Sequence, residues 1–336
     1  MKASQSPYHV TLVATPDTQI SPLSGLYETF NSFSLLAEFE PNLPQKPFSV
    51  EIVTPDIGKQ EESGLSIGNH RRCNEIEHTD ICVIPLMMVK GPGWIKGRYP
   101  EIVDWLCEMH QQGAILCSAC TGVLLLAETG LLNGQVATIH WAFAPTFHRN
   151  FPKVNLKTEE VLITSGKQNE FVMTGGVMSW HDLALHLIAR HVGPTGAQAI
   201  ARFLMLQWHS EGQAPYITFS PKKDHDDALI LRLQEWLQTH FMEPDPLEEM
   251  IERSGRARRT LERRFKKATD LTPLKYVQNL RISEARRKLE RTNLPVEKIG
   301  FEVGYENTAF FRRLFKRITR LTPSAYRRKF QILKNI

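Results

Sequence analysis

The sequence contains no apolar run of the roughly 18 residues that a membrane-spanning helix requires. Its N-terminus shows no charged segment followed by an apolar one, so we expect no export signal, no membrane partner and a cytoplasmic location. The remaining composition, with 42% apolar and 23% charged residues, is that of soluble globular proteins. At 336 residues the chain is long for one domain, and we expect two.

Cysteine is also scarce. The five cysteines are an odd number, which disfavours a disulfide framework and fits a reducing compartment. Cys117 and Cys120 form one Cys-x-x-Cys pair, but without a second pair this is a poor zinc motif, and we expect no metal and no cofactor. A redox couple normally places its second cysteine one helical turn after the first. Because Cys117 is expected in a strand, a thiol-redox regulator is kept only as an alternative.

Charge of each sign is unevenly distributed. Residues 222–336 hold 27 Lys and Arg against 16 Asp and Glu, a formal charge of +11, whereas residues 1–221 carry −6. A basic C-terminal part joined to an acidic N-terminal part predicts a polyanion partner for the C-terminal part alone. The alternative is a charge-rich, solvated helical domain, which charge by itself does not exclude.

Short apolar strands alternate with helices in the N-terminal part. Runs typical of buried strands lie at residues 9–15, 48–54, 80–86, 113–122 and 161–166. Helical stretches lie at residues 24–39, 101–112, 124–132 and 180–192. This alternation predicts an α/β domain over residues 1–211, with a mostly parallel, flavodoxin-like sheet flanked by helices.

A linker is expected at residues 212–226, where the alternation stops and two prolines and a cluster of charges occur. Residues 227–336 are predicted to be an all-α domain, because helical runs are separated by turn-plus-proline stops. Two stops, "DLTP" and "RLTP", open similar segments about 50 residues apart, which indicates a repeated helical unit.

Each repeat contains two short helices separated by a tight turn, the arrangement of a helix-turn-helix. The first unit has a helix ending near Gly255 and a second helix at residues 257–268. The second unit has helices at residues 296–304 and 308–318, and Asn307 is suited to cap the latter. The residues expected to face inward are Leu261, Phe265 and Ala268 in the first unit and Phe311, Leu314, Phe315 and Ile318 in the second. The opposite faces carry Arg and Lys, which suit guanine and phosphate.

Residues 227–330 resemble the AraC/XylS family of transcription regulators, above all in "KIGFEVGYENTAFFRRLFKRITRLTPSAYRR". The resemblance implies a linking helix, here residues 274–290, between two units whose recognition helices enter successive major grooves of double-stranded DNA. Carried over by position, the base-reading residues are Arg258, Arg259, Glu262 and Arg263 in the first unit and Thr308, Ala309, Arg312 and Arg313 in the second. Where the family usually has a Ser cap the first recognition helix has Ala257, so its base contacts are expected to be held less rigidly.

Cys120 is the most chemically distinctive residue of the N-terminal part. We expect it on a tight turn between a buried strand and a helix, where the helix dipole favours thiolate, with His140 as the nearest possible base. Residues 9–192 resemble the PfpI-like family, with its class I glutamine-amidotransferase-type fold, in "ACTG", "ATIHW" and "TGGVMSWHDLALHLIARHVG". A PfpI-like domain followed by an AraC-type domain is the layout of GlxA-type regulators, which the chain resembles.

Two departures from the PfpI-like pattern argue against catalysis. Hydrolytic members usually carry His directly after the cysteine, where this chain has Thr121, and many relatives carry an acid where it has Pro22. We therefore expect that the chain is not an enzyme. We expect instead a small-molecule effector bound near Cys120, Thr121, His140 and Trp141. A hydrolase or amidase that depends on Cys120 is the alternative.

The resemblance also implies the kind of input and output. Relatives of this layout often sense small nitrogenous metabolites, and aromatic walls suit a quaternary ammonium. Trp94, Trp141 and Trp180 could form such walls, although core packing explains tryptophans more simply. His181 is interpreted as structural rather than as a ligand. We expect a homodimeric activator in which the effector biases dimer geometry or domain orientation, and so the fit to two half-sites.

Overall fold

The chain folds into two compact units, Met1–Gln213 and Ala214–Ile336, in a computed structural model that describes residues 6–55, 70–89 and 93–332. Most of the segment predicted as a linker groups with the second unit. Its backbone is held there because Arg286 donates to the carbonyl oxygen of Ala214 at 3.1 Å. Phe219, further along the segment, lies edge-on to the ring of Tyr276.

A seven-stranded sheet forms the centre of the first unit, in the order β3-β2-β1-β4-β5-β9-β8. The strands are β1 (Tyr8–Val13), β2 (Phe48–Thr54), β3 (Arg71–Arg72), β4 (Ile81–Ile84), β5 (Ile115–Ala119), β8 (Leu162–Ser165) and β9 (Phe171–Thr174). Neighbouring strands are parallel except for β8 and β9. The predicted α/β class with a mostly parallel sheet is confirmed. The predicted strands did not include β9 or the two-residue strand β3.

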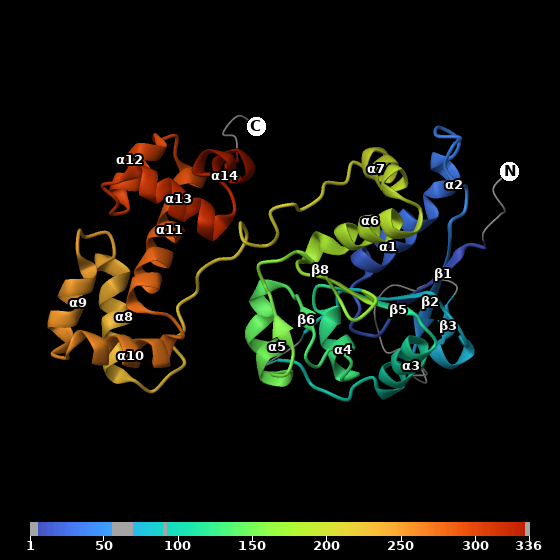
Figure 1. Cartoon of the computed structure of the whole chain (residues 1–336), viewed down its shortest axis with the longest axis horizontal. Coiled ribbons are helices and arrows are strands. Elements are labelled where there is room, and N and C mark those ends of the chain that lie inside the picture. The colour runs from blue at the N-terminus through green and yellow to red at the C-terminus, as the bar shows by residue number, and fades with distance from the viewer. Residues whose placement is uncertain (1–5, 56–69, 90–92, 333–336) are drawn as a thin grey trace. The chain divides into compact units, whose positions relative to one another are not determined.

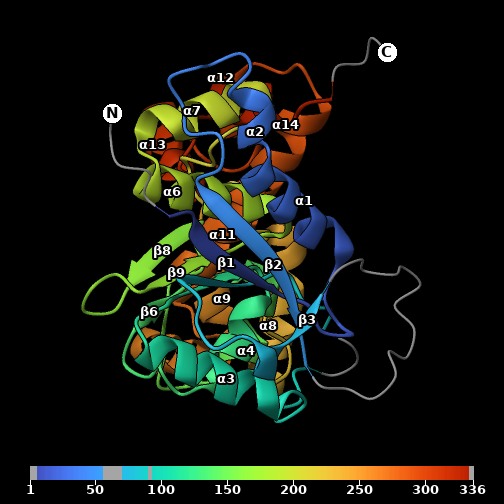
Figure 2. The same ribbon diagram turned by 90° about the vertical axis from the view of Figure 1, so that its right-hand side faces the viewer.

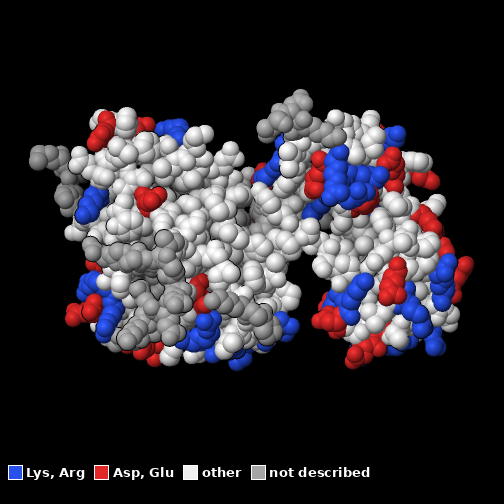
Figure 3. Space-filling view, turned by 180° about the vertical axis from the view of Figure 1, so that it is seen from behind, with Lys and Arg blue, Asp and Glu red and all other residues white. Residues whose placement is uncertain are grey.

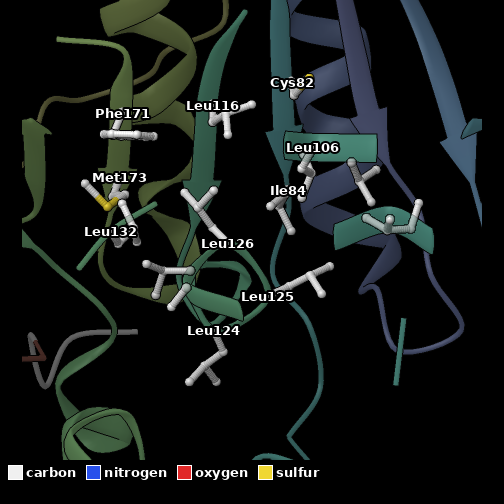
Figure 4. Close-up of a cluster of buried hydrophobic side chains, with 14 of the residues drawn as sticks. Cys82, Ile84, Leu106, Leu116, Leu124, Leu125, Leu126, Leu132, Phe171 and Met173 are labelled. Atoms are coloured by element: carbon white, nitrogen blue, oxygen red, sulfur yellow. The ribbon is translucent and has the colours of Figure 1, made fainter. Parts of the chain in front are cut away.

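Helices cover both faces of this sheet (Figures 1 and 2). One layer contains α1 (Ile20–Asn31), α2 (Phe33–Leu36), α6 (Trp180–His191) and α7 (Pro194–Phe203), and the other contains α3 (Pro100–Gln111) and α4 (Gly122–Glu128). Successive strand residues point to opposite faces, so Ile81 and Val83 pack against the first layer and Cys82 and Ile84 against the second. Figure 4 shows leucines of α4 meeting β5 and β9 in the second layer. The helix predicted at residues 24–39 is divided at Ser32.

Smaller elements connect α4 to α6 and complete the first unit. Two short parallel strands, β6 (Val136–Ala137) and β7 (Asn155–Leu156), form a second sheet. The remaining elements are α5 (Ala144–Asn150) and the single 3-10 turns η1 (Cys73–Glu75), η2 (Trp141–Phe143) and η3 (Val177–Ser179).

The second unit is helical, as predicted (Figure 1). Its helices are α8 (Ala228–His240), α9 (Pro246–Ser254), α10 (Arg258–Thr269), α11 (Pro273–Arg291), α12 (Val296–Glu302), α13 (Thr308–Thr319) and α14 (Pro323–Phe330). Two separate apolar clusters lie along the long helix α11. Its first half packs with α8, α9 and α10, and its second half packs with α12, α13 and α14. No helix in the described part of the chain is both long and apolar enough to cross a membrane.

The two helix-turn-helix units end in the same turn, 50 residues apart, which confirms the repeat. Thr272 and Thr322 each cap the following helix by accepting a backbone N–H three residues on. Asp270 and Arg320 adopt left-handed backbone, with φ of 62° and 58°. The closing turn joins α10 to α11 in the first helix-turn-helix unit and α13 to α14 in the second.

Within the C-terminal unit, Arg281 on α11 connects the two helix-turn-helix units. Its guanidinium donates to the carbonyl oxygens of Phe241 (2.7 Å) and Glu243 (2.6 Å) at the end of α8, and to that of Gly304 (2.7 Å) in the second unit. It also lies over the ring of Tyr305, 5.0 Å from the centroid. Gly304 has a φ of 93°, and a Cβ there would collide with the guanidinium. The buried guanidinium of Arg281 thus fixes the turn at Gly304, in the second helix-turn-helix unit, to the end of α8.

Candidate DNA-reading helices and effector site

The turn between α9 and α10 brings the first recognition helix to the surface. Asp245 caps α9 by accepting the N–H of Glu248 at 3.3 Å, and Gly255 ends that helix with a φ of 60°. Ala257 opens α10 without any side-chain cap, as its sequence predicts. Without that cap, α10 is held by packing of Leu261, Phe265 and Ala268, which are buried as predicted, and by the ion pair of Arg258 with Glu248.

The four predicted base readers of α10 are exposed, and these are Arg258, Arg259, Glu262 and Arg263. Arg258 is not free, because its guanidinium pairs with Glu248 of α9. Of the described residues, none forms an ion pair with Arg259 or Arg263. Arg264, one position further, instead binds the carboxylate of Asp227 at 2.8 Å and so holds α10 to the start of α8.

The second recognition helix is better capped. Asn307 accepts the N–H of Phe310 at 2.8 Å, which confirms the predicted cap. Phe311, Leu314 and Phe315 are buried, and Ile318 packs beside them. Among the predicted base readers of α13, Ala309, Arg312 and Arg313 are exposed and Thr308 is half-buried. Arg312 pairs with Glu297 of α12, whereas no described residue forms an ion pair with Arg313.

Each recognition helix therefore has an arginine paired with a glutamate of the preceding helix. The paired side chains Arg258, Glu248, Arg312 and Glu297 are each between 52% and 57% exposed. Exposed ion pairs are screened by solvent and contribute little to stability, so a phosphate or a guanine edge can replace either glutamate at small cost. Figure 3 shows positive and negative side chains interspersed over the visible face of the second unit. The visible surface is therefore not uniformly positive, and contacts to DNA would depend on where individual arginines lie.

Cys120 lies at the carboxyl end of β5 in a strained turn. It has a φ of 55°, and its N–H donates to the carbonyl oxygen of Thr174 at 2.7 Å. The thiol is buried, and burial raises its pKa to about 12, against a smaller opposing effect of hydrogen bonds from Thr121 and Gly176. The expected thiolate is therefore wrong: the desolvation of the charged form outweighs what the start of a helix can contribute.

Thr121 and Gly122 pack the same turn against the end of β4. The Thr121 hydroxyl donates to the carbonyl oxygen of Met87 and accepts the N–H of Met87 at 3.1 Å. A Cβ at position 122 would collide with the carbonyl oxygens of Ile84 and Pro85, so only glycine fits there. Thr121 thus connects the ends of β4 and β5 through hydrogen bonds, at the position where hydrolytic PfpI-like proteins usually have His.

His140 and Trp141 form an aromatic pair at the start of η2. Their ring centroids are 5.4 Å apart and the rings are stacked, with Phe143 edge-on to His140 at 5.8 Å. His140 Nδ1 accepts the N–H of Ala142 at 3.2 Å, and burial lowers the pKa of the imidazole. No hydrogen bond between His140 and Cys120 is found among the described residues. The two side chains that a nucleophilic mechanism would couple are not coupled by any contact in the part of the chain described.

Gln213 connects this aromatic pair to the turn after β9. Its amide nitrogen donates to the carbonyl oxygen of Ile139 at 2.9 Å, and its oxygen accepts the N–H of Trp141 at 3.3 Å. A Cβ at Gly175 would collide with the Gln213 amide, so the glutamine sits directly on that backbone. Sequence reasoning missed Gln213 because it falls within the predicted linker.

Asp17 is a second residue that the sequence did not single out. It is 4% exposed, at the carboxyl end of β1, and accepts the Tyr99 hydroxyl at 2.6 Å and the Arg98 guanidinium at 2.5 Å. The strand order reverses between β1 and β4, and ligands of open α/β sheets bind at such switch points. Asp17 thus places an acid at the switch point. Position 22, where many PfpI-like relatives carry an acid, is instead the buried Pro22 of α1.

Two of the three tryptophans considered as pocket walls are packing residues. Trp94 is buried and donates to Glu128 at 2.6 Å, and the Trp180 ring lies against the backbone at Gly25, where a Cβ would collide with it. His181, Asp182 and His209 bring together side-chain atoms of the kind that bind metal ions, within 4.8 Å of one another.

Comparison with known proteins assigns a class to the second unit. A helix-turn-helix domain family matches residues 250–329. The chain is 27% identical over 263 residues to the HTH-type transcriptional regulator CdhR of Pseudomonas aeruginosa, covering 78% of this chain and 76% of that protein. It is 26% identical over 277 residues to the HTH-type transcriptional regulator GlxA of Rhizobium meliloti, covering 80% and 81%. A ThiJ/PfpI family protein from Pseudomonas syringae aligns with a TM-score of 0.47 at 18% identity, covering 62% of this chain and 79% of that one.

Proposed function

We propose that this chain, whose C-terminal unit contains an AraC-type helix-turn-helix domain, is a sequence-specific DNA-binding transcription regulator. The observation that carries the proposal is the pair of recognition helices, α10 and α13, each with exposed arginines on a face opposite its buried core. The same 50-residue repeat builds both, and Arg281 ties the end of α8 to the turn at Gly304 that precedes α13.

Base reading is assigned to the exposed side chains of these helices. Arginine binds the O6 and N7 atoms of guanine through two parallel hydrogen bonds, and Glu262 suits the exocyclic amine of cytosine. The readers we propose are Arg258, Arg259, Glu262 and Arg263 in α10 and Thr308, Ala309, Arg312 and Arg313 in α13. Two helices held in one domain and entering successive major grooves read half-sites about 10 base pairs apart.

Selection of bound DNA from a random pool by the full-length protein tests this function. We expect enrichment of two short conserved blocks whose centres are about 10 base pairs apart. The double variant Arg259→Ala with Arg313→Ala should lose the enrichment, whereas Arg202→Ala, which removes an exposed arginine of the first unit, should keep it. A pool without any enriched motif would refute the proposal.

The first unit is proposed to bind a small cationic, nitrogenous effector near the carboxyl ends of β1, β4 and β5. The stacked rings of His140 and Trp141 offer aromatic faces to a cation. The buried carboxylate at the switch point, Asp17, already binds Arg98 and Tyr99, so the proposal rests on the aromatic pair. Cys120 and Thr121 form the turn at the carboxyl end of β5. Effector binding is proposed to bias the geometry of a homodimer, and activation of transcription is the proposed outcome.

Thermal unfolding with a panel of quaternary and primary ammonium metabolites tests the effector. A ligand at 100 times its Kd stabilises the protein by about 2.7 kcal/mol, which a shift in Tm reports. Trp141→Ala should abolish that shift, and Trp208→Ala, at an exposed tryptophan, should retain it. A shift that Trp141→Ala leaves intact would place the ligand elsewhere.

A catalytic role is not proposed for the first unit. The supporting observations are the raised pKa of Cys120 and the bridging role of Thr121. Hydrolysis of amide or ester substrates by the purified protein, abolished by Cys120→Ser, would overturn this.

A further inference from the structure

A cluster of two imidazoles and a carboxylate lies in the first unit, apart from the residues assigned above. His181 and Asp182 open α6, and His209 belongs to the segment that follows α7. The His181 and His209 rings are stacked nearly parallel, 17° apart, with centroids separated by 5.2 Å. Sequence places His209 27 residues from Asp182, so only the fold brings the three together.

Asp182 holds the centre of the cluster through both oxygens. One oxygen accepts the backbone N–H of His209 at 2.8 Å, and the other lies 2.7 Å from Nδ1 of the same residue. That second oxygen is also 3.7 Å from Nδ1 of His181. The carboxylate is therefore fixed by the backbone while its second oxygen faces two ring nitrogens.

The Nδ1 atom of His181 is buried and has no hydrogen-bond partner among the described residues. If this nitrogen carried the proton, no acceptor would lie within hydrogen-bond distance. If it did not, its lone pair would face a carboxylate oxygen 3.7 Å away. Either tautomer leaves a buried polar atom unsatisfied, which costs about 1–3 kcal/mol. A cation between the nitrogen and the oxygen satisfies both atoms.

The charge of the cluster points the same way. Asp182 is 2% exposed, and within the described part of the chain its ion-pair partners are His181 and His209, with no lysine or arginine among them. A buried carboxylate is retained in proteins when a cation or a set of hydrogen bonds compensates it, and in the described part of the chain the hydrogen bonds to the Asp182 carboxylate come from His209 alone.

Against the expectation from the sequence of no metal and a structural His181, we propose that His181, Asp182 and His209 bind a divalent transition-metal ion, with Zn²⁺ as the best fit. Two imidazole nitrogens and one carboxylate oxygen are ligands that Zn²⁺ takes at about 2.0–2.2 Å, whereas Ca²⁺ and Mg²⁺ prefer oxygen alone. Tetrahedral ligands at these lengths lie about 3.3 Å apart. The 3.7 Å separation fits that value, and the 2.7 Å separation opens by about half an ångström once the metal replaces the shared proton.

The metal would link helix α6 to the last segment of the first unit. The backbone carbonyl oxygen of His209 accepts the N–H of Gly212 at 3.0 Å, and Gln213 is the next residue along the chain. Gln213 holds the carbonyl oxygen of Ile139 and the N–H of Trp141. Metal binding would therefore order the segment that supports the aromatic pair, which would couple the metal to the proposed effector site.

Metal titration of the chelator-stripped, full-length protein tests the site. One equivalent of Zn²⁺ should bind and raise the unfolding temperature, and Co²⁺ should give the visible absorption of a tetrahedral site. Asp182→Asn and His209→Gln should each lower the affinity by at least about 100-fold. His148→Ala, which removes an exposed histidine of the same unit, should bind as the wild type does.

Nitrogen NMR of histidine-labelled wild-type protein provides a measurement that does not depend on whether a variant folds. Zn²⁺ should shift Nδ1 of His181 into the range of metal-bound imidazole. Failure of the wild type to bind Zn²⁺, unchanged binding in Asp182→Asn, or an unshifted His181 would each overturn the proposal. The DNA-binding function would survive all three outcomes, because no residue of the second unit is involved.

Discussion

The arginines of the two recognition helices differ in their freedom to meet a base. Arg258 and Arg312 are held by glutamates of the preceding helices, whereas Arg259, Arg263 and Arg313 form no ion pair with any residue that the structure describes. An unpaired guanidinium can contact DNA without first releasing a partner. Arg313 is therefore the side chain from which we expect the clearest effect.

Replacing Arg313 by Ala should lower DNA affinity by about 1–3 kcal/mol and relax specificity at one base pair, because a bidentate contact to guanine is lost. Binding assays against operators substituted at each position measure this, with Arg202→Ala as the control for removal of one positive charge. An equal loss for every DNA sequence would instead assign Arg313 to a phosphate.

Cys120 should behave as a protected thiol. Its folded-state pKa of about 12 exceeds the ordinary value of 9.0, so the folded state retains a proton that the unfolded state releases. Stability from this thiol is present below pH 9 and is lost as the pH rises from 9 towards 12. In alkylation at pH 8 followed by mass spectrometry, the half-buried Cys107 should react before Cys120. Preferential labelling of Cys120 would restore the nucleophile hypothesis.

At the scale of elements, the two recognition helices differ at their first residue. Asn307 caps α13 and Ala257 leaves α10 uncapped. An N-cap is worth about 0.5–2 kcal/mol, so Asn307→Ala should speed hydrogen exchange at the Phe310 amide by roughly five-fold. Ala257→Ser should slow exchange in the first turn of α10 by a similar factor. Unchanged exchange in both variants would show that packing alone holds these turns.

The linking helix sets the spacing of the two readers through Arg281. Lysine at this position is a single ammonium group and does not reach the carbonyl oxygens of Phe241, Glu243 and Gly304 together. We expect Arg281→Lys to lower affinity for a two-block operator by roughly ten-fold, because unsatisfied carbonyls cost about 1–3 kcal/mol. Affinity for a single block should change little. Arg291→Lys, at an exposed position of the same helix, is the matched control.

For the whole molecule, the distribution of charge predicts how binding depends on salt. The excess of +11 lies in residues 222–336, and positive side chains there alternate with negative ones (Figure 3). About six phosphate contacts predict a slope near −5 in a plot of log affinity against log salt concentration. Measurements of Kd between 50 and 200 mM salt determine that slope. A slope near zero would indicate that the basic surface does not meet the DNA backbone.

The sequence by itself determined the architecture and the recognition helices. Strand runs, helix periods, Gly255 and Asn307 are local signals that act over a few residues, so β2, α6, α10 and α13 were predictable without the fold. The two-fold use of one turn was equally visible, because its threonine and proline stand 50 residues apart in matching contexts.

Only the tertiary structure decided the chemistry of the side chains. Cys120 looks like a thiolate on a helix N-terminus, yet burial determines its pKa, and burial depends on the chain packed around it. Gln213 and Asp17 acquire their roles from partners more than 70 residues away. The contact of His209 with Asp182 likewise spans two helices. Desolvation and long-range pairing are properties of the folded molecule, and no local pattern in the sequence encodes them.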